Sequence, residues 1–265
     1  KALEYLDPKK LPEADTAPAL IVLRGHAFAM RGMFDDATRL YQAALKIDPK
    51  SADASIGLAR LASMQRQPEQ ALALLDGVLA HSPTNADALL MKGDILRRDG
   101  KRDEAIQLYE RALAADKGKD QAYLSLIAMA IEVDQLPKAR AYLTDLQKVS
   151  ANNLYARHLE AVILLREKQP DQALTKILEV LKLAPALPAA NLLAANIEYS
   201  KGMYQQAITH LNAVLANSPN NLPAQRLMVA TLLKQNEADK ASELLNKLTE
   251  QYPDDPALLS LTGEA

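Results

Sequence analysis

The sequence predicts an all-α fold built from repeated pairs of antiparallel helices. One alanine recurs every 34 residues without slippage, at Ala37, Ala71, Ala105, Ala139, Ala173, Ala207 and Ala241. A second series lies twelve residues further on and holds a proline in five of the seven copies, at Pro49, Pro83, Pro185, Pro219 and Pro253. No stretch shows the strict alternation of a half-buried strand. A fixed period of this length is typical of helical repeat proteins.

The period divides the chain into three parts. With Pro18 as the first position, residues 18–255 form seven repeats of 34 residues. Residues 1–17 are expected to be the end of a preceding repeat followed by an irregular insertion. Residues 256–265 restart the pattern as a truncated eighth repeat, with Gly263 at position 8. The chain starts at Lys1 without a basic and then apolar leader, so we expect an excised piece of a longer protein.

Each repeat is predicted to hold a helix, a tight turn, a second helix and a turn marked by proline. In the first repeat the first helix runs from about Ala19 to Arg31. Glycines that close a first helix in a left-handed conformation are expected at Gly32, Gly100 and Gly202. Prolines tolerated in the first turn of a second helix are Pro68, Pro137 and Pro170.

Small residues are expected to set the distance between the two helices of a repeat. Alanine at position 20 and glycine or alanine at position 8 allow the helices to touch, and larger side chains at positions 24, 28 and 30 are expected to fill the layer between repeats. Repeat 4 departs from this pattern because Ile127 occupies position 8. Its two helices are therefore expected to lie further apart or to tilt.

The composition argues against several classes of function. The chain has 31 basic and 33 acidic residues, so no strong net field attracts nucleic acid or anionic membrane. It has no cysteine, which excludes disulfides, thiolate nucleophiles and cysteine-based zinc sites. The apolar uncharged run from Leu183 to Ile197 is too short to span a bilayer.

No catalytic motif emerges from the sequence. The four histidines fall at repeat positions 9, 30, 5 and 23, so none align as a ligand pair, and no phosphate-binding loop or nucleophile motif is present. Acidic pairs such as Asp35-Asp36 and Asp103-Glu104 open second helices, where carboxylates complement the helix dipole. We therefore expect no enzyme activity, no catalytic residues, no metal and no cofactor.

The pattern resembles the tetratricopeptide repeat (TPR) family. The resemblance rests on the period, the alanine at position 20, the tyrosines Tyr41 and Tyr109 at position 24, the proline at position 32 and the small residues at position 8, which are Gly25, Ala59, Gly93, Ala161 and Ala195. It covers residues 18–255. It implies a right-handed superhelical solenoid of antiparallel helix pairs, with a concave inner face.

The resemblance also implies where a partner binds. Members of the family use positions 2, 5, 9, 12 and 13 of the first helices. The candidate groove residues at these positions are His26, Met30, Arg60, Met64, Leu90, Asp94, Arg97, Arg98, Leu124, Ile131, His158, Val162, Arg166, Asn196, Tyr199, Arg226 and Lys234. This apolar floor with scattered arginines predicts an apolar peptide or protein segment with some acidic residues. The lysine and asparagine that clamp chaperone tails in some relatives are absent, because Asn196 is paired with Leu192.

A second resemblance concerns the start of the repeats. "LDPKKLP" from Leu6 to Pro12, followed by "LRGHAFAMRGMFDDA" from Leu23 to Ala37, is similar to the segment that leads into the repeats in TPR lipoproteins of the bacterial envelope. These accompany PEP-CTERM/exosortase protein sorting and exopolysaccharide export. The resemblance implies a periplasmic or outer-membrane-anchored scaffold, with a cytoplasmic location as the alternative.

Two other functions stay open at this point. One is the substrate-recognition arm of a larger enzyme, such as a glycosyltransferase, with its catalytic domain outside this chain. The other is a helical-repeat RNA binder, which is disfavoured because a basic groove and base-reading residues in each repeat are missing.

Overall fold

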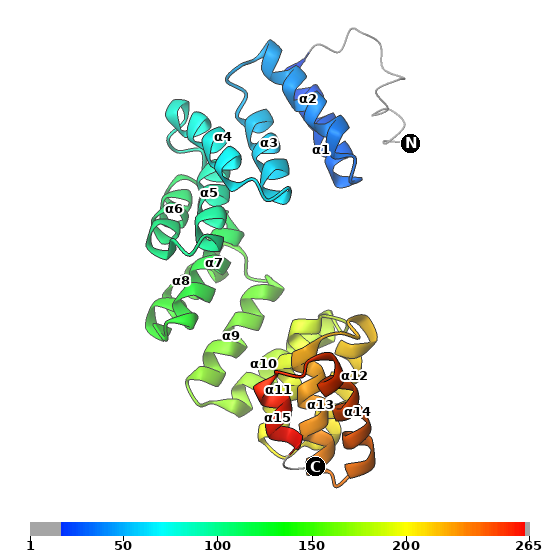
Figure 1. Cartoon of the computed structure of the whole chain (residues 1–265). Helices are drawn as coiled ribbons and strands as arrows, with labels where there is room; N and C mark the ends of the chain where they lie inside the picture. The colour runs from blue at the N-terminus through cyan, green and yellow to red at the C-terminus, as the bar shows by residue number, and fades with distance from the viewer. Residues whose placement is uncertain (1–16, 263–265) are drawn as a thin grey trace. The chain divides into compact units, whose positions relative to one another are not determined.

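The computed structural model describes residues 17–262, which form fifteen α-helices and contain no strand (Figure 1). The all-α fold class is therefore confirmed. The helices are α1 (Pro18–Met30), α2 (Phe34–Ile47), α3 (Ala52–Met64), α4 (Pro68–His81), α5 (Ala86–Arg98), α6 (Arg102–Ala115), α7 (Asp120–Glu132), α8 (Leu136–Val149), α9 (Leu154–Arg166), α10 (Pro170–Leu183), α11 (Pro188–Ser200), α12 (Tyr204–Asn217), α13 (Leu222–Lys234), α14 (Ala238–Gln251) and α15 (Pro256–Thr262).

The helices follow the period of the sequence. First helices begin every 34 residues from Pro18 to Pro256, and second helices do so from Phe34 to Ala238. The chain divides into two compact units. The first ends at Leu126 and the second begins at Ile127, so the boundary lies within α7. The preceding repeat expected in residues 1–17 falls almost wholly outside the described residues, as does Gly263. None of the described helices is long and apolar enough to cross a membrane.

Asparagine side chains fix the start of several first helices. Asn85, Asn153 and Asn221 follow one another at intervals of 68 residues, and each Oδ1 accepts a hydrogen bond of 2.9–3.0 Å from the backbone N–H three residues later. Such a cap pairs one of the N–H groups that a helix start leaves free, which contributes about 1 kcal/mol.

A left-handed residue closes the first helix in each of the seven repeats, as predicted for the three glycines. Gly32, Gly100 and Gly202 have φ of 75°, 78° and 75°. At the same position, the other four repeats place non-glycine residues with φ of 56–61°: Arg66, Asp134, Lys168 and Asn236. The next residue then donates a hydrogen bond of 2.9–3.0 Å to the carbonyl five residues earlier, as in the bonds from Met33 to Phe28 and from Gln67 to Ala62.

Replacing Lys168 by glycine is expected to raise the free energy of unfolding by about 0.5–1 kcal/mol. A non-glycine residue in the left-handed region costs about 1–2 kcal/mol, and the greater freedom of glycine in the unfolded chain offsets part of the gain. Gly202→Ala should lower stability by a similar amount. Urea denaturation followed by circular dichroism measures both variants, and a loss of stability in Lys168→Gly would contradict the prediction.

Small residues set the helix spacing as expected. All seven alanines at position 20 have 0% exposure. At position 8, an added Cβ on Gly25 would lie 2.5 Å from Cε1 of Tyr41, and one on Gly93 would lie 2.8 Å from Cε1 of Tyr109. Both tyrosine rings therefore occupy the space that a side chain at position 8 would need.

The expectation for position 30 is wrong. Positions 24 and 27 are buried in all seven repeats, whereas Ile47, Val149 and Leu183 at position 30 are 51%, 46% and 64% exposed. Position 30 is the last residue of its helix. At 100° per residue it also points about 80° away from the line through positions 20, 24 and 27. The packing layer consequently ends one turn earlier than the sequence suggested.

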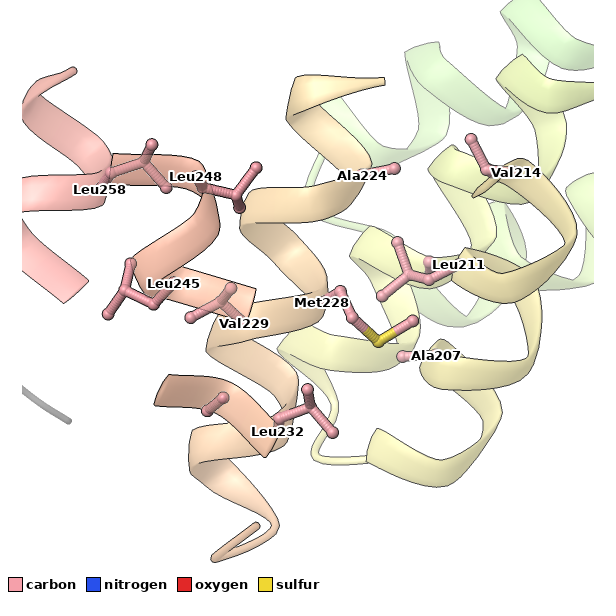
Figure 2. Packing of buried hydrophobic residues seen from close by; sticks show 12 residues of the cluster. Ala207, Leu211, Val214, Ala224, Met228, Val229, Leu232, Leu245, Leu248 and Leu258 are labelled. Carbon is pink, nitrogen blue, oxygen red and sulfur yellow. The ribbon is translucent and has the colours of Figure 1, made fainter. Parts of the chain in front are cut away.

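The second compact unit shows how neighbouring repeats share a core. Figure 2 places Leu211 of α12 beside Met228 of α13, while Leu245 and Leu248 of α14 cover the other side of α13. Leu258 of α15 extends the same cluster. Because side chains from successive helices interdigitate, no pair of helices buries its apolar face alone.

Candidate functional site

A hollow of about 570 Å³ lies in the first compact unit, among α1, α2, α3 and α5. We call it the N-terminal hollow. Its lining residues are His26, Ala29, Met30, Tyr41, Asp53, Ile56, Gly57, Arg60, Leu61, Met64 and Asp87. Four of the predicted groove residues, His26, Met30, Arg60 and Met64, therefore lie together around one cavity.

The floor of the hollow is organised by Tyr41. Its side chain is 1% exposed and lies against two glycines, Gly25 of its own repeat and Gly57 of the next, where an added Cβ would lie 2.6 Å from Cζ. The hydroxyl is hydrogen-bonded to Nδ1 of His26 at 2.8 Å, and the two rings meet edge to face with centroids 5.4 Å apart. Tyr41 thus holds the imidazole of His26 in place through both contacts.

Burial keeps this floor uncharged. It raises the pKa of Tyr41 above its usual value. It also lowers the pKa of His26, and the positive charge of Arg60 lowers it further, while Asp53 acts weakly in the opposite direction. At neutral pH both rings are therefore neutral.

The rim of the hollow is apolar and accessible. Met30 is 89% exposed and Met64 is 59% exposed, and both occupy position 13 of their repeats. Beneath them, Ile56 and Leu61 are 7% and 4% exposed and belong to the core. Methionine side chains are flexible and polarisable, so this rim can adapt to apolar groups of different shape.

Charges flank the rim. Arg60 is exposed, and no carboxylate among residues 17–262 forms an ion pair with it. Asp87 pairs with Lys119, whose Nζ lies 2.8 Å from Oδ1. The guanidinium of Arg60 is therefore available for an acidic group on a ligand, which it can bind through two parallel N–H bonds.

In repeat 3, two of the four predicted residues form hydrogen bonds between helices. The hydroxyl of Tyr109 donates to Oδ1 of Asp94 at 2.7 Å, and burial together with this bond raises the pKa of Tyr109 to about 12. Arg98 donates to Oγ of Ser63 on α3 at 2.6 Å. Asp94 and Arg98 therefore contribute contacts within the fold, while Arg97 remains exposed and Leu90 half-buried.

The other predicted residues lie outside the N-terminal hollow. On α9, His158, Val162 and Arg166 are four residues apart and share one face; the pKa of His158 is lowered by burial. Arg226 forms an ion pair with Asp255. The others differ in exposure: Ile131 is buried, Leu124 and Tyr199 are half-buried, and Asn196 and Lys234 are exposed.

Seven lining residues of the hollow were not predicted from the sequence as groove residues; three of them, Ala29, Ile56 and Leu61, are apolar, and the other four are Tyr41, Asp53, Gly57 and Asp87. Tyr41 was expected to fill the layer between helices, which it does while also forming the floor. Asp53 and Asp87 occupy position 2, one of the positions that the family resemblance names, so this signal was present in the sequence. Gly57 carried no signal, because its importance comes from the approach of Tyr41 from the preceding repeat.

These helix pairs of constant length define an α-helical repeat protein. Tetratricopeptide repeat models match residues 28–95, 62–130 and 198–264, and a second model of the same description matches residues 158–221. The chain belongs to the tetratricopeptide repeat family, which confirms the resemblance drawn from the 34-residue period.

Several proteins have related sequences. Cellulose synthase operon protein C of Pseudomonas fluorescens is 26% identical over 88% of this chain and 22% of its own length. The uncharacterised protein y4yS of Sinorhizobium fredii is 34% identical over 39% of this chain and 58% of its own length. Protein O-mannosyl-transferase Tmtc3 of Drosophila melanogaster is 28% identical over 51% of this chain and 15% of its own length. The chain spans less than two thirds of each of these relatives.

Solved structures share the fold. The type IV pilus biogenesis factor PilW aligns with a TM-score of 0.70 at 16% identity, covering 80% of this chain and 98% of its own. The Cut9–Hcn1 assembly of the APC/C aligns with a TM-score of 0.71 at 17% identity, covering 87% of this chain and 45% of its own. YrrB is described as a TPR protein with an unusual peptide-binding site. It aligns with a TM-score of 0.52 at 23% identity, covering 69% of this chain and 95% of its own. At these identities the likeness shows the fold alone.

Proposed function

We propose that this chain is a non-catalytic scaffold that binds an apolar, acidic-residue-containing segment of a partner protein in the N-terminal hollow. The observation that carries the proposal is the combination of two exposed methionines with Arg60, which has no ion-pair partner among residues 17–262, above the fixed floor of Tyr41 and His26. TPR domains bind protein or peptide partners, so the proposal adds the site and the chemistry of the partner.

The physical argument has two parts. Covering the exposed side chains of Met30 and Met64 removes apolar surface from water, which is worth about 25 cal/mol per Å². A carboxylate of the partner placed on Arg60 adds charge-assisted hydrogen bonds and fixes the register of the segment. Because Tyr41 and His26 are already ordered, little conformational entropy is lost at the floor on binding.

We further propose that the parent protein works in a bacterial cell-envelope export or assembly system, for exopolysaccharide or for protein sorting. The match to cellulose synthase operon protein C over 88% of this chain supports the exopolysaccharide branch. The proposal places the parent in the periplasm or on the outer membrane. Fractionation of the full-length parent from a bacterial cell tests this, and recovery only with the cytoplasm would contradict it.

The alternative proposal is that the chain selects substrates for a larger enzyme. Tmtc3 is named a protein O-mannosyl-transferase, and the tomato protein SPINDLY, 34% identical over 32% of this chain, is named a probable N-acetylglucosaminyltransferase. Both matches cover 15% or less of those proteins. A glycosyltransferase domain in the full-length parent would favour this alternative, and further 34-residue repeats would favour the scaffold.

The double substitution Arg60→Glu with Met64→Glu should weaken peptide binding about tenfold or more. It reverses the charge at the rim and removes an apolar contact, and each such loss at a binding centre typically costs over 1 kcal/mol. Peptides are selected from a random library on the wild-type chain and their dissociation constants are measured by fluorescence anisotropy. We expect the selected peptides to combine apolar residues with Asp or Glu.

A matched control makes the same chemical changes elsewhere. Lys46→Glu with Ile47→Glu alters one cation and one exposed apolar residue at the end of α2, outside the hollow. This variant should bind the selected peptides as the wild type does. Equal binding by both double variants would rule out the hollow as the site.

A further inference from the structure

Three polar side chains meet inside repeat 6, where other repeats are mostly apolar. Glu198 and Asn191 of α11 are 3% and 2% exposed, and the side chain of His210 on α12 is 20% exposed. Position 11, which holds Glu198, is Phe, Ala or Leu in the other six repeats. Position 23, which holds His210, is leucine in repeats 1, 2, 3 and 7. A buried carboxyl at a core position carries a desolvation cost that the packing of the fold does not require.

The hydrogen bonds of Asn191 determine which nitrogen of His210 carries a proton. Nδ2 of Asn191 donates to the carbonyls of Pro185 at 2.8 Å and Leu187 at 3.1 Å, which fixes the orientation of the amide. Its Oδ1 therefore faces Nδ1 of His210, at 2.9 Å, and accepts from it. In the neutral ring, the proton lies on Nδ1 and Nε2 carries a lone pair.

That lone pair points at a carboxyl. Nε2 of His210 lies 3.5 Å from Oε1 of Glu198. The other carboxyl oxygen, Oε2, is buried and has no hydrogen-bond partner among the described residues. If both groups lack a proton, two lone pairs face each other away from water. A single proton, on either atom, turns this contact into an attraction.

Burial decides where the proton lies. It raises the pKa of Glu198 to about 7 and lowers the pKa of His210. In weakly acidic solution the proton is therefore on Glu198 and the imidazole is neutral. As the pH rises past neutrality, Glu198 loses the proton while His210 cannot supply another.

The other charged side chains on the helices around Glu198 either form ion pairs elsewhere or are at least partly exposed. Helices α10, α12 and α13 all contact α11. The ionisable group of α12 that faces Glu198 is His210. On α10, Asp171 pairs with Lys201 and Lys176 with Glu160, and on α13 Arg226 pairs with Asp255. Of the other charged side chains on these helices, Lys182 and Lys234 are exposed and Glu179 is half-exposed. The raised pKa of Glu198 follows from its burial.

We propose that Glu198, His210 and Asn191 form a proton-dependent latch between α11 and α12. The latch is closed while one proton lies between Glu198 and His210. When that proton is lost, an ionised carboxyl remains buried without a donor, and repeat 6 opens more often to admit water. This inference does not depend on the proposed binding function.

The direction of the pH effect follows from linkage. The pKa of Glu198 in the folded state, about 7, lies above its ordinary value of 4.5. Its contribution to stability is therefore fully present below about pH 4.5 and is lost as the pH rises through 7. His210 acts in the opposite direction, because its lowered pKa favours the fold as the pH rises toward its ordinary value of 6.5. A variant that lacks only the carboxyl separates the two effects.

The test compares the wild-type chain with Glu198→Gln by hydrogen exchange and mass spectrometry of peptides from α11 and α12. The glutamine Nε2 can donate to His210 at every pH and so imitates the protonated carboxyl. After correction for intrinsic exchange, hydrogen exchange gives the equilibrium constant for local opening. The ratio of this constant in the wild type to that in the variant should grow roughly tenfold between pH 6 and pH 8. The same ratio for α3 and α4 should stay constant. An unchanged ratio for α11 and α12 would overturn the latch.

A second variant keeps the test decisive if the glutamine chain folds poorly. Glu198→Leu with His210→Leu installs the pair that repeat 3 holds as Leu96 and Leu108, and repeat 7 as Leu232 and Leu244. Relative to this variant, wild-type opening in α11 and α12 should still increase between pH 6 and pH 8, but by less than the roughly tenfold expected against the glutamine variant, because His210 acts in the opposite direction to Glu198. A decrease in that ratio would also overturn the proposal.

Discussion

Replacing Leu211 by alanine is expected to lower the free energy of unfolding by about 2–5 kcal/mol. The side chain of Leu211 has 0% exposure and lies at position 24, where α12 packs against its neighbours (Figure 2). Removing it leaves a cavity that two adjacent repeats share, so the surroundings collapse only partly. Urea denaturation followed by far-ultraviolet circular dichroism measures the change.

Leu183 provides the control for this prediction. It is also a leucine on the second helix of its repeat, but it is 64% exposed at position 30. Leu183→Ala should change the free energy of unfolding by no more than about 0.5 kcal/mol. Similar losses for both variants would mean that position 30 belongs to the packing layer after all.

Gly25→Ala is expected to lower the free energy of unfolding by about 1–3 kcal/mol, against the general preference of helices for alanine. The new Cβ would lie 2.5 Å from Cε1 of Tyr41, so the ring must move and its hydrogen bond to His26 must distort. Thermal or urea unfolding measures the loss. Gly77→Ala, in the middle of α4 with no atom within 4 Å of the new Cβ, should instead gain about 1 kcal/mol. A gain in both variants would contradict the tight contact.

The chain itself suggests how the clash can be relieved. Repeats 1 and 3 combine glycine at position 8 with tyrosine at position 24, whereas repeats 2, 5 and 6 combine alanine with leucine or isoleucine. In a double-mutant cycle, Tyr41→Leu should therefore cost less beside Gly25→Ala than in the wild type. Additive losses would show that the two positions do not compensate each other.

The sequence predicted the fold well because each signal is local and recurs seven times. Position 20 alanines and the left-handed residues report on contacts within one repeat, and every copy must solve the same packing problem. Position 30 was misjudged because apolar character alone does not reveal where a helix ends. Ile47 looked like a packing residue, yet it is the last residue of α2 and is exposed.

The candidate site could be predicted only in part. The family pattern located His26, Met30, Arg60 and Met64, which the structure gathers around one hollow. The roles of Tyr41 and Gly57 depend on how closely one repeat packs against the next. The distance between two repeats cannot be predicted from the sequence of either repeat alone. Arg226 shows a different limit, since its ion pair with Asp255 joins the first helix of repeat 7 to the last residue of the same repeat.

The left-handed junction after each first helix makes whole repeats interchangeable. Its backbone geometry and its closing hydrogen bond are the same whether the residue is Gly32, Arg66, Asp134, Lys168 or Asn236. A gene segment cut at one junction and rejoined at another would therefore restore the turn, and the new helix pair would pack where its residues at positions 8 and 24 match. Recombination between copies can lengthen or shorten such a protein by whole helix pairs, and the length of the binding surface becomes a property that evolution can change in steps of 34 residues.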